Sequence, residues 1–521
     1  MGNKESLKAI FSNYLLTFIL AVTFIYSVGY AAQRSFWIDE SMVALAIVNS
    51  SLSPFEPLVV YNQVSPWGFV LLTRLSQSLF GAGDLQFRLP GLLFYLAGMS
   101  YHAHFLKQRY GLLTASAITV AILANPLLLR YSTEFKHYIY EFTFVVLILI
   151  SYLRWKDGDA RSIWAYGVSI GLSILFGVSI VFIIGAIFIF ESFDQLKKSP
   201  RNFIRSNWLI LHAIFGILFL FWYVFSITPN LKYNLMNYPH IYGVDLGPVN
   251  LTNLSHWGKV LVNAILSIMV PQSVLFLICL SGFIIHRRWE RKPSNWAILV
   301  LPVLLYLIIY AANFSGFYPI LIDRHLLYTL PVFYLLFAYA LTHFSLNFDS
   351  KWLKAGAPII LILMAFITSG IYHFNNDFFF QEIKPVLAEI QTDDDLFVYF
   401  SAQPGYEWYK FTRYRDLPEP INPQVNPDSG PAIPLEEMTA DLPNRIEETG
   451  AWPTIALLTQ LEEAHLYEED YMGEMIKKEG ESLLLISHRS GLYLRNYLEE
   501  TCGISRIFRR PGASVYRVNC P

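Results

Sequence analysis

The chain has 521 residues, of which 54% are apolar and 15% are charged, whereas soluble domains carry about 25% charged residues. Long apolar blocks recur until about residue 373, and a single soluble core could not bury them all, because large cores split into separate domains. The formal net charge of −2 gives no sign of a nucleic-acid partner, and we expect none. Composition therefore excludes an ordinary soluble domain and favours a membrane protein.

The apolar blocks predict a polytopic α-helical membrane protein with about eleven transmembrane helices, since roughly 17 to 25 apolar residues cross the hydrocarbon of a bilayer. The first block is too long for a typical signal-peptide core, so we interpret it as a retained span. The predicted spans cover residues 9–30, 86–105, 112–130, 139–153, 163–177, 178–191, 207–226, 259–285, 295–312, 326–345 and 356–373.

Lysine and arginine concentrate in alternate loops, and the positive-inside rule places these loops in the cytoplasm. Their basic residues are Lys4 and Lys8; Lys107 and Arg109; Arg154, Lys156 and Arg161; Lys197, Lys198, Arg201 and Arg205; Arg287, Arg288, Arg291 and Lys292; and Lys351 and Lys354. The N-terminus is then cytoplasmic, and the segment after the last span lies on the outer side.

The block 163–191 allows two interpretations. A single long helix would place the next basic loop outside and invert everything after it. Two short crossings, or a re-entrant pair that turns near Gly177 and Ser179, keep that loop inside. We adopt the second interpretation.

From about residue 374 the composition becomes soluble, which divides the chain into a transmembrane domain (1–373) and an extracytoplasmic domain (374–521). Segments 382–390, 404–414 and 490–500 predict helices. Segment 393–401 predicts a turn followed by a strand, and segments 454–460, 481–489 and 513–519 predict strands. This alternation is typical of a small α/β domain. Cys502 and Cys520 lie in a compartment that permits disulfides, so a bridge and two free thiols are both open.

The first outer loop, about residues 31–85, carries an acidic pair a few residues after the first span. Asp39 and Glu40 are candidate catalytic residues, and the alternative is a solvated loop or helix-cap pair. Residues 66–80 are apolar with polar side chains interspersed, among them Arg74, Ser76 and Gln77, a pattern typical of a helix lying in the membrane interface. Such a helix can form a wall beside the acidic pair. Arg88 is expected to anchor the start of the second span.

The second outer loop, RYSTEFKHYIYE, is short and rich in ionisable groups. If it begins the next helix, Glu134, His137 and Glu141 share one face. Lys136 and Tyr140 share another face, and Tyr138 lies between them in the sequence. Ionisable groups so close to the hydrocarbon usually face a cavity or a partner, and the alternative is internal pairing that only braces helices.

A third cluster, Asp323, Arg324 and His325, stands at the mouth of another span. Arg324 could reach lipid headgroups with its long side chain, or it could bind a phosphate through its planar guanidinium. The three clusters share one membrane face. Acids and bases gathered there suit an anionic lipid headgroup and a reaction.

Four segments resemble motifs of the GT-C superfamily of integral-membrane glycosyltransferases, in its bacterial branch related to protein O-mannosyltransferases and the lipid A aminoarabinose transferase. They are FWIDES, SPWGFVLLTRLSQSLFGAGDLQFRLP, YSTEFKHY and DRHLLYTLP, which lie in family order between residues 30 and 335. The chain departs from the family where Ser65 and Pro66 replace a Pro-Pro pair. Gln63 and Val64 also stand where some members have a lysine or histidine.

The resemblance implies a bacterial inner-membrane enzyme that moves a sugar from a polyprenyl-phosphate donor, such as undecaprenyl phosphate, to a glycan, lipid or protein acceptor, with inversion. A carboxylate must take the acceptor proton, and we assign this to Asp39, with Glu40 as a supporting or metal-facing group. The leaving phosphate needs cations. The candidate donor-binding residues are Gln63, Glu134, Lys136, His137, Tyr138, Arg324 and His325. Related enzymes vary in metal dependence, which leaves a divalent metal ion open, with Asp39 and Glu134 as candidate ligands.

Two other functions fit a polytopic protein of this kind. A transporter or flippase for a lipid-linked sugar would use the same cavity without chemistry, but transporters often place charges near the bilayer midplane. Here the charges cluster at one face, which favours an enzyme. An inactive assembly scaffold is the second alternative, and the intact acidic and basic motifs weigh against it.

Overall fold

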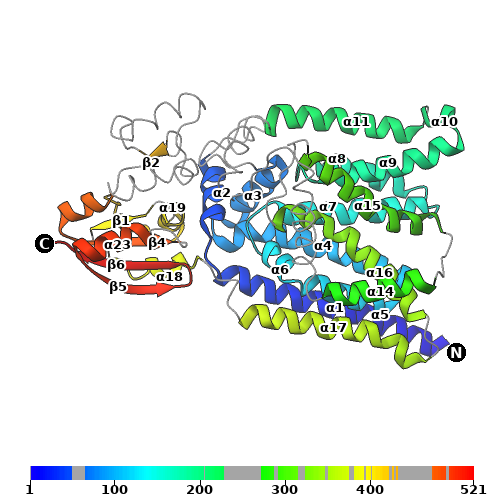
Figure 1. Ribbon diagram of the computed structural model, residues 1–521, viewed down its shortest axis with the longest axis horizontal. Coiled ribbons are helices and arrows are strands. Elements are labelled where there is room, and N and C mark those ends of the chain that lie inside the picture. Colours follow the sequence, from blue (N-terminus) through cyan, green and yellow to red (C-terminus); the bar gives the residue numbers. More distant parts are fainter. Residues whose placement is uncertain are drawn as a thin grey trace, which may run out of the picture.

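The computed structural model of the chain describes residues 2–49, 65–204, 206–227, 272–286, 292–314, 323–346, 350–374, 381–391, 395–399, 402–421, 425–426, 430–431, 472–487 and 492–521. A bundle of helices makes up one end of the molecule, and a smaller unit with a β-sheet lies at the other end (Figure 1). The C-terminus belongs to the smaller unit, whereas the N-terminus lies at the far end of the bundle.

The bundle contains long helices, short helices and two irregular helical turns. In chain order these are α1 (Gly2–Gln33), α2 (Ile38–Asn49), α3 (Trp67–Phe80), α4 (Asp84–Tyr110), α5 (Leu112–Leu123), α6 (Pro126–Ser132), α7 (Tyr138–Lys156), α8 (Ser162–Ser173), α9 (Ile180–Lys198), α10 (Pro200–Ile204), α11 (Asn207–Trp222), η2 (Tyr223–Ile227), α14 (Gln272–His286), α15 (Pro293–Phe314), η4 (Asp323–Thr329), α16 (Leu330–Leu346) and α17 (Lys351–Phe374).

Within the described residues, 6 helices are long and apolar enough to cross a membrane, or 7 if a bent pair counts as one span. They belong to α1, α7, α11, α15, α16 and α17, and each coincides with a predicted span. The total of about eleven spans stays a prediction. One reason is that the predicted span 259–285 is described only from residue 272, where α14 begins.

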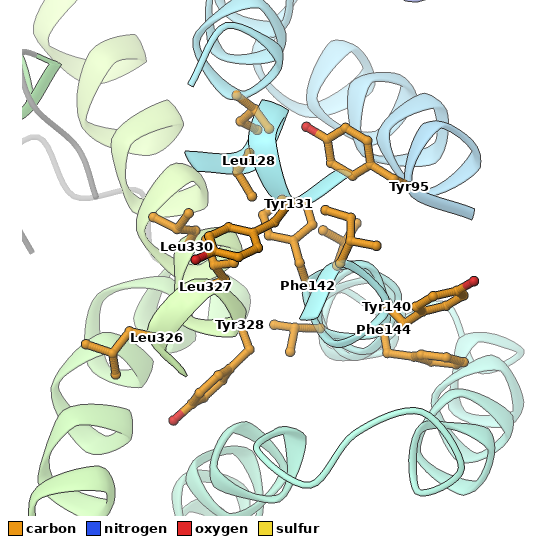
Figure 2. Close-up of a cluster of buried hydrophobic side chains, with 14 of the residues drawn as sticks. Tyr95, Leu128, Tyr131, Tyr140, Phe142, Phe144, Leu326, Leu327, Tyr328 and Leu330 are labelled. Atoms are coloured by element: carbon orange, nitrogen blue, oxygen red, sulfur yellow. The ribbon is translucent and has the colours of Figure 1, made fainter. Parts of the chain in front are cut away.

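The spanning helices divide into a central and a peripheral group. The apolar windows of α16 and α7 are 94% and 78% buried, whereas those of α1, α11 and α17 are each 22% buried. Figure 2 shows the centre of this packing, where Leu128 and Tyr131 of α6 lie among side chains from α7 and from the segment of η4 and α16. The peripheral helices therefore expose the apolar surface that a bilayer would cover.

The predicted span 112–130 is not one straight helix. It is divided into α5 and α6, whose axes differ by 65°. Asn125 ends the first helix and caps the second, because its side-chain oxygen accepts hydrogen bonds from the N–H groups of Leu127 (3.0 Å) and Leu128 (3.2 Å). Pro126 takes the first helical position, where its missing N–H costs nothing. The Asn-Pro pair thus bends the span.

The block 163–191 forms two helices, α8 and α9, as the second interpretation requires. The turn between them meets the start of α7, where Glu141 accepts hydrogen bonds from the N–H groups of Val178 (3.0 Å) and Ser179 (3.3 Å). The other end of α9 meets the end of α7, where Lys156 contacts Glu191 at 2.5 Å. The two helices therefore run in opposite directions beside α7, and a single long helix is excluded.

The smaller unit contains a four-stranded sheet in the order β1-β4-β6-β5. Its strands are β1 (Leu396–Val398), β4 (Glu481–Ser487), β5 (Gly503–Arg510) and β6 (Ala513–Asn519), and β2 (Val425–Asn426) pairs separately with β3 (Gly430–Pro431). Strands β1 and β4 are parallel, whereas the other neighbours are antiparallel. The unit also holds α18 (Ile383–Leu387), α19 (Gln403–Thr412), a helix at 472–479 and α23 (Leu492–Thr501).

Most predicted elements of this unit are present, with one addition. The predicted strands at 393–401, 481–489 and 513–519 contain β1, β4 and β6, and the three predicted helices overlap α18, α19 and α23. The predicted strand 454–460 lies outside the described residues. Strand β5 was not predicted, because GISRIFRR is mostly exposed at the sheet edge and lacks regular apolar alternation.

Cys502 and Cys520 form a disulfide, which decides between the two open alternatives. The bond joins the start of β5 to the end of β6, whose neighbouring residues Gly503 and Asn519 are paired in the sheet. Cys279, in α14, is a buried free cysteine.

Replacing both bridged cysteines, Cys502→Ser together with Cys520→Ser, should loosen the β5–β6 hairpin. The bond spans 18 residues. A loop of this length restricts the unfolded chain by about 3 kcal/mol in the loop-entropy description. Hydrogen exchange of the β5 peptide should accelerate in the double variant, while exchange in α16 stays the same. A free thiol at either position in non-reducing peptide maps of the wild-type protein would contradict the bond itself.

Candidate functional site

The acidic pair lies at the start of a helix that follows the first span. Helix α1 ends at Gln33, the link Arg34–Trp37 follows, and α2 begins at Ile38 with Asp39 and Glu40 in its first turn. Carboxylates at this end of a helix are stabilised by its unpaired N–H groups. Glu40 caps the helix, since it accepts a hydrogen bond from the N–H of Trp37 at 3.3 Å. The helix-cap alternative is therefore right for Glu40.

Glu40 and Arg88 form a fully buried, two-pronged ion pair. The Arg88 Nε donates to one carboxylate oxygen at 2.9 Å, and Nη2 donates to the other at 2.7 Å. Arg34 adds a second cation at 3.5 Å. Burial raises the pKa of Glu40, but the charges of Arg88 and Arg34 outweigh it and hold that pKa below its ordinary value.

Of the two positions that the sequence left open for Glu40, supporting or metal-facing, its contacts are those of a supporting group. Besides Arg88, its carboxylate accepts a hydrogen bond from the N–H of Phe135 at 2.5 Å, and its side chain is 0% exposed. Glu40 thereby joins α2, α4 and the second outer loop. Arg88 takes the anchoring position expected at the start of the second span, inside α4.

The second outer loop is not helical between α6 and α7. Residues 133–137 connect the two helices, so Glu134, His137 and Glu141 do not share the predicted helix face. Glu141 instead binds the turn between α8 and α9. Glu134 accepts a hydrogen bond from Arg130 Nε at 2.7 Å and lies 3.9 Å from Arg34. Internal pairing thus occupies Oε1 of Glu134, while Oε2 is buried with no hydrogen bond from the described residues.

Asp39 and Lys136 form the partly exposed ion pair of this region. Their Oδ2 and Nζ atoms are 3.7 Å apart, and their side chains are 28% and 8% exposed. The neighbours of both residues in sequence, Glu40 and Phe135, are fixed in the buried network. A carboxylate and an ammonium group are therefore held at a position that solvent or a ligand can reach, beside a rigid buried core.

The predicted interfacial helix is present as α3 and borders this site. Phe69 packs edge-on against the His137 ring, with a centroid separation of 6.4 Å, and His137 in turn packs against Tyr138 at 4.6 Å. The opposite face of α3 is apolar and exposed, with Leu75 51% and Leu79 65% accessible. One face thus lines the site, while the other suits contact with lipid.

Three predicted site residues lie wholly or partly outside the described residues. Gln63 is among the residues that the structure does not describe. Arg324 and His325 belong to η4, whose backbone is described and packs against α6 and α7, but the two side chains lie outside the description. The first and second clusters are therefore brought together, and the backbone of the third lies beside them.

The predicted metal ligands do not fit a metal ion. Asp39 faces Lys136, and Glu134 lies between Arg130 and Arg34, so cationic groups already neutralise both carboxylates. Within the described residues, no three His, Cys, Asp or Glu side chains gather closely enough to hold a metal. We assign no reaction step to one.

Sequence patterns missed four residues that contact this region. Asp84 begins α4, and the other three come from the smaller unit: Gln381, Glu382 and Tyr409. These three accept hydrogen bonds from the main chain between Ser35 and Ile38, more than 340 positions away in sequence. Local patterns carry no signal for such contacts.

No protein-family model and no curated protein matches the chain. Two solved structures of ArnT from Cupriavidus metallidurans are similar to it. The structure bound to undecaprenyl phosphate has 12% identity and a TM-score of 0.54, with 97% of each chain covered. The apo structure has 11% identity and a TM-score of 0.55, with 98% of each chain covered.

The chain has the ArnT fold. The fold that the four short motifs led us to expect is thereby confirmed. Coverage of 97% of both chains means that the likeness extends over the bundle and the smaller unit alike.

Proposed function

We propose that this protein is a membrane glycosyltransferase that moves a sugar from a polyprenyl-phosphate donor to an acceptor on the outer side of the bacterial inner membrane. The observation that carries the proposal is the partly exposed pair of Asp39 and Lys136, held beside a buried ionic core. The ArnT fold supports it, because one ArnT structure binds undecaprenyl phosphate.

In the proposed reaction, the acceptor hydroxyl attacks the anomeric carbon while its proton passes to Asp39. A new bond from the acceptor oxygen to the anomeric carbon forms as the bond from that carbon to the phosphate oxygen breaks. Attack from the opposite side inverts the anomeric carbon. The polyprenyl phosphate leaves with the bonding electrons and an additional negative charge.

Lys136 suits the second half of this reaction. While Asp39 is ionised, the two charges compensate each other at 3.7 Å. Once Asp39 accepts the acceptor proton, its negative charge is lost, and the positive charge of Lys136 can then act on the departing phosphate. The pair therefore links proton removal to stabilisation of the leaving group. His137, Tyr138, Arg324, His325 and Gln63 remain proposed donor contacts, and Glu134 acts through its arginine partners.

The proposed topology follows from the same reaction. Asp39 stands beyond the end of α1 that is distant from the N-terminus, and the smaller unit lies on that side of the bundle (Figure 1). With a cytoplasmic N-terminus, residues 374–521 form a periplasmic domain that follows the transmembrane domain 1–373. The acceptor, whether glycan, lipid or protein, would then be reached from the periplasm.

Mass spectrometry of co-purifying lipids tests the proposal. Wild-type protein and Asp39→Asn are purified in mild detergent, and their bound lipids are compared. We expect Asp39→Asn to retain a polyprenyl-phosphate sugar, because it can bind the donor without consuming it. Added acceptor should release the sugar from the wild-type sample only. Absence of such a lipid from both samples would contradict the proposal, and equal retention by both with acceptor present would favour a transporter.

A further inference from the structure

The link Arg34–Trp37 is held by α4 through its carbonyl groups. Arg88 Nη1 donates to the carbonyl oxygens of Ala31 (2.7 Å) and Arg34 (2.8 Å), and Nη2 donates to that of Ser35 (2.9 Å). The last carbonyls of a helix have no partner within the helix, so α1 requires donors of this kind where it ends. Arg88 supplies the donors for these three carbonyls while it also binds Glu40, and the Ala32 carbonyl accepts from Lys384 at 3.4 Å.

The smaller unit holds the same link, together with the first residue of α2, through their N–H groups. Three acceptors receive these hydrogen bonds: Glu382 from Ser35 (3.1 Å), Tyr409 from Phe36 (2.7 Å) and Gln381 from Ile38 (2.6 Å). Glu382 also accepts a hydrogen bond from the Ser35 hydroxyl at 2.9 Å. Arg88 of α4 thus binds carbonyl groups of the link, whereas the smaller unit binds its N–H groups.

Asp84 connects α4 to the smaller unit. This first residue of α4 accepts hydrogen bonds from Tyr409 (2.9 Å), from Trp408 (3.1 Å) and from Lys384, whose ammonium group is 2.9 Å away. Tyr409 is fully buried, and burial together with the charge of Asp84 raises the pKa of its hydroxyl well above the ordinary value. The neutral hydroxyl can therefore donate to Asp84 and accept from Phe36 at the same time.

We propose that Gln381, Glu382 and Tyr409 are positioning residues of the transfer reaction, which fix the main chain from Ser35 to Ile38 and thereby hold Asp39 beside Lys136. The inference rests on the proposed function for the role of Asp39. It assigns the smaller unit a part in completing the active site, in addition to any binding of the acceptor.

The covalent geometry explains why this position matters. The N–H of Ile38 is bound to Gln381, and Asp39 is the next residue, with its Cα only about 3.8 Å further along the chain. Its side chain has few bonds through which to compensate a shift of the backbone. A displacement of about 1 Å at a reacting group can lower a rate by about 100-fold.

The test compares Tyr409→Phe with Tyr406→Phe. Both tyrosines are buried in α19, but the Tyr406 hydroxyl donates to the Pro418 carbonyl within the smaller unit, whereas the Tyr409 hydroxyl contacts the link and Asp84. Tyr409→Phe should lower kcat by about 10-fold to 100-fold while KM for the donor changes by less than about two-fold. Tyr406→Phe should leave kcat within about two-fold.

Hydrogen exchange gives a readout that does not depend on the reaction. The peptide that contains residues 35–38 should exchange faster in Tyr409→Phe than in wild type or Tyr406→Phe. Glu382→Ala should do the same, whereas Glu382→Gln keeps an acceptor oxygen and should restore most of the protection and of kcat.

The outcomes separate the two proposals. Unchanged exchange of residues 35–38 in both Tyr409→Phe and Glu382→Ala would overturn the inference, whatever the activity. Faster exchange with an unchanged kcat would overturn it as well, because Asp39 would then not depend on the link. A wild-type protein that transfers no sugar from any polyprenyl phosphate would overturn the proposed function and the catalytic meaning of the inference, while the exchange result would still establish the contact.

Discussion

Asp39→Asn should reduce the transfer rate by about 100-fold to 10,000-fold, the range that a positioned general base contributes. The amide is close to the carboxylate in shape, but it cannot take the proton of the acceptor and it carries no charge opposite Lys136. The loss should fall on kcat, while KM for the donor changes little, because proton removal occurs in the transition state. Initial rates with a polyprenyl-phosphate sugar and the acceptor measure both constants.

Asp157→Asn is a matched control for this variant. Asp157 is also a carboxylate paired with a cation, Arg109, and its side chain is 30% exposed against 28% for Asp39. It follows α7 at the end opposite the candidate site, so its loss should leave kcat within about two-fold, as ordinary surface changes do. Similar kcat values for Asp39→Asn and wild type would remove Asp39 from the mechanism.

The motifs of the site could be recognised in the sequence, but the different roles of the residues within each motif could not. Asp39 and Glu40 are adjacent acids, and no local pattern shows that one is partly exposed and the other fully buried. The difference arises because Arg88, 48 positions away, reaches Glu40 from α4. At Glu134 the prediction of secondary structure was wrong. The spacing of Glu134, His137 and Glu141 suggested one helix face, but residues 133–137 form a non-helical connection between α6 and α7.

Apolar length predicted the spans well, whereas breaks within them depended on single residues. Asn125 and Pro126 together form a cap and a first helical position, so the bend between α5 and α6 was readable from capping chemistry rather than from hydropathy. The turn between α8 and α9 was predicted from the positive charge of the loop that follows α9, and the sequence of the two helices alone did not indicate it. The contacts of Gln381 and Tyr409 had no sequence signal at all.

Glu40→Ala should destabilise the protein by about 3 to 5 kcal/mol, because it leaves Arg88 as a buried cation without its carboxylate. The comparison is Asp157→Asn, which removes a partly exposed pair and should cost less than about 1 kcal/mol. Thermal unfolding in detergent, followed by tryptophan fluorescence, measures the two midpoints. We expect the midpoint of Glu40→Ala to fall several times further.

The pH dependence has a definite sign. Because the folded pKa of Glu40 lies below its ordinary value of 4.5, its contribution to stability is fully present above that value and is lost as pH falls through the folded pKa. As the pH falls below 4.5, the unfolding free energy of the wild-type protein should therefore decrease more steeply than that of Glu40→Ala.

The double variant Glu40→Leu with Arg88→Met separates two contributions to the free energy of unfolding. One is the destabilisation by an unpaired buried charge, and the other is the stabilisation by the intact ion pair. If the unpaired guanidinium causes the loss in Glu40→Ala, removing both charges should restore much of the stability, since apolar replacements of buried pairs are often neutral. It should not restore transfer, because the carbonyls of Ala31, Arg34 and Ser35 lose their donor and the segment that leads to Asp39 is released. A double variant that recovered both stability and transfer would show that Arg88 does not position Asp39.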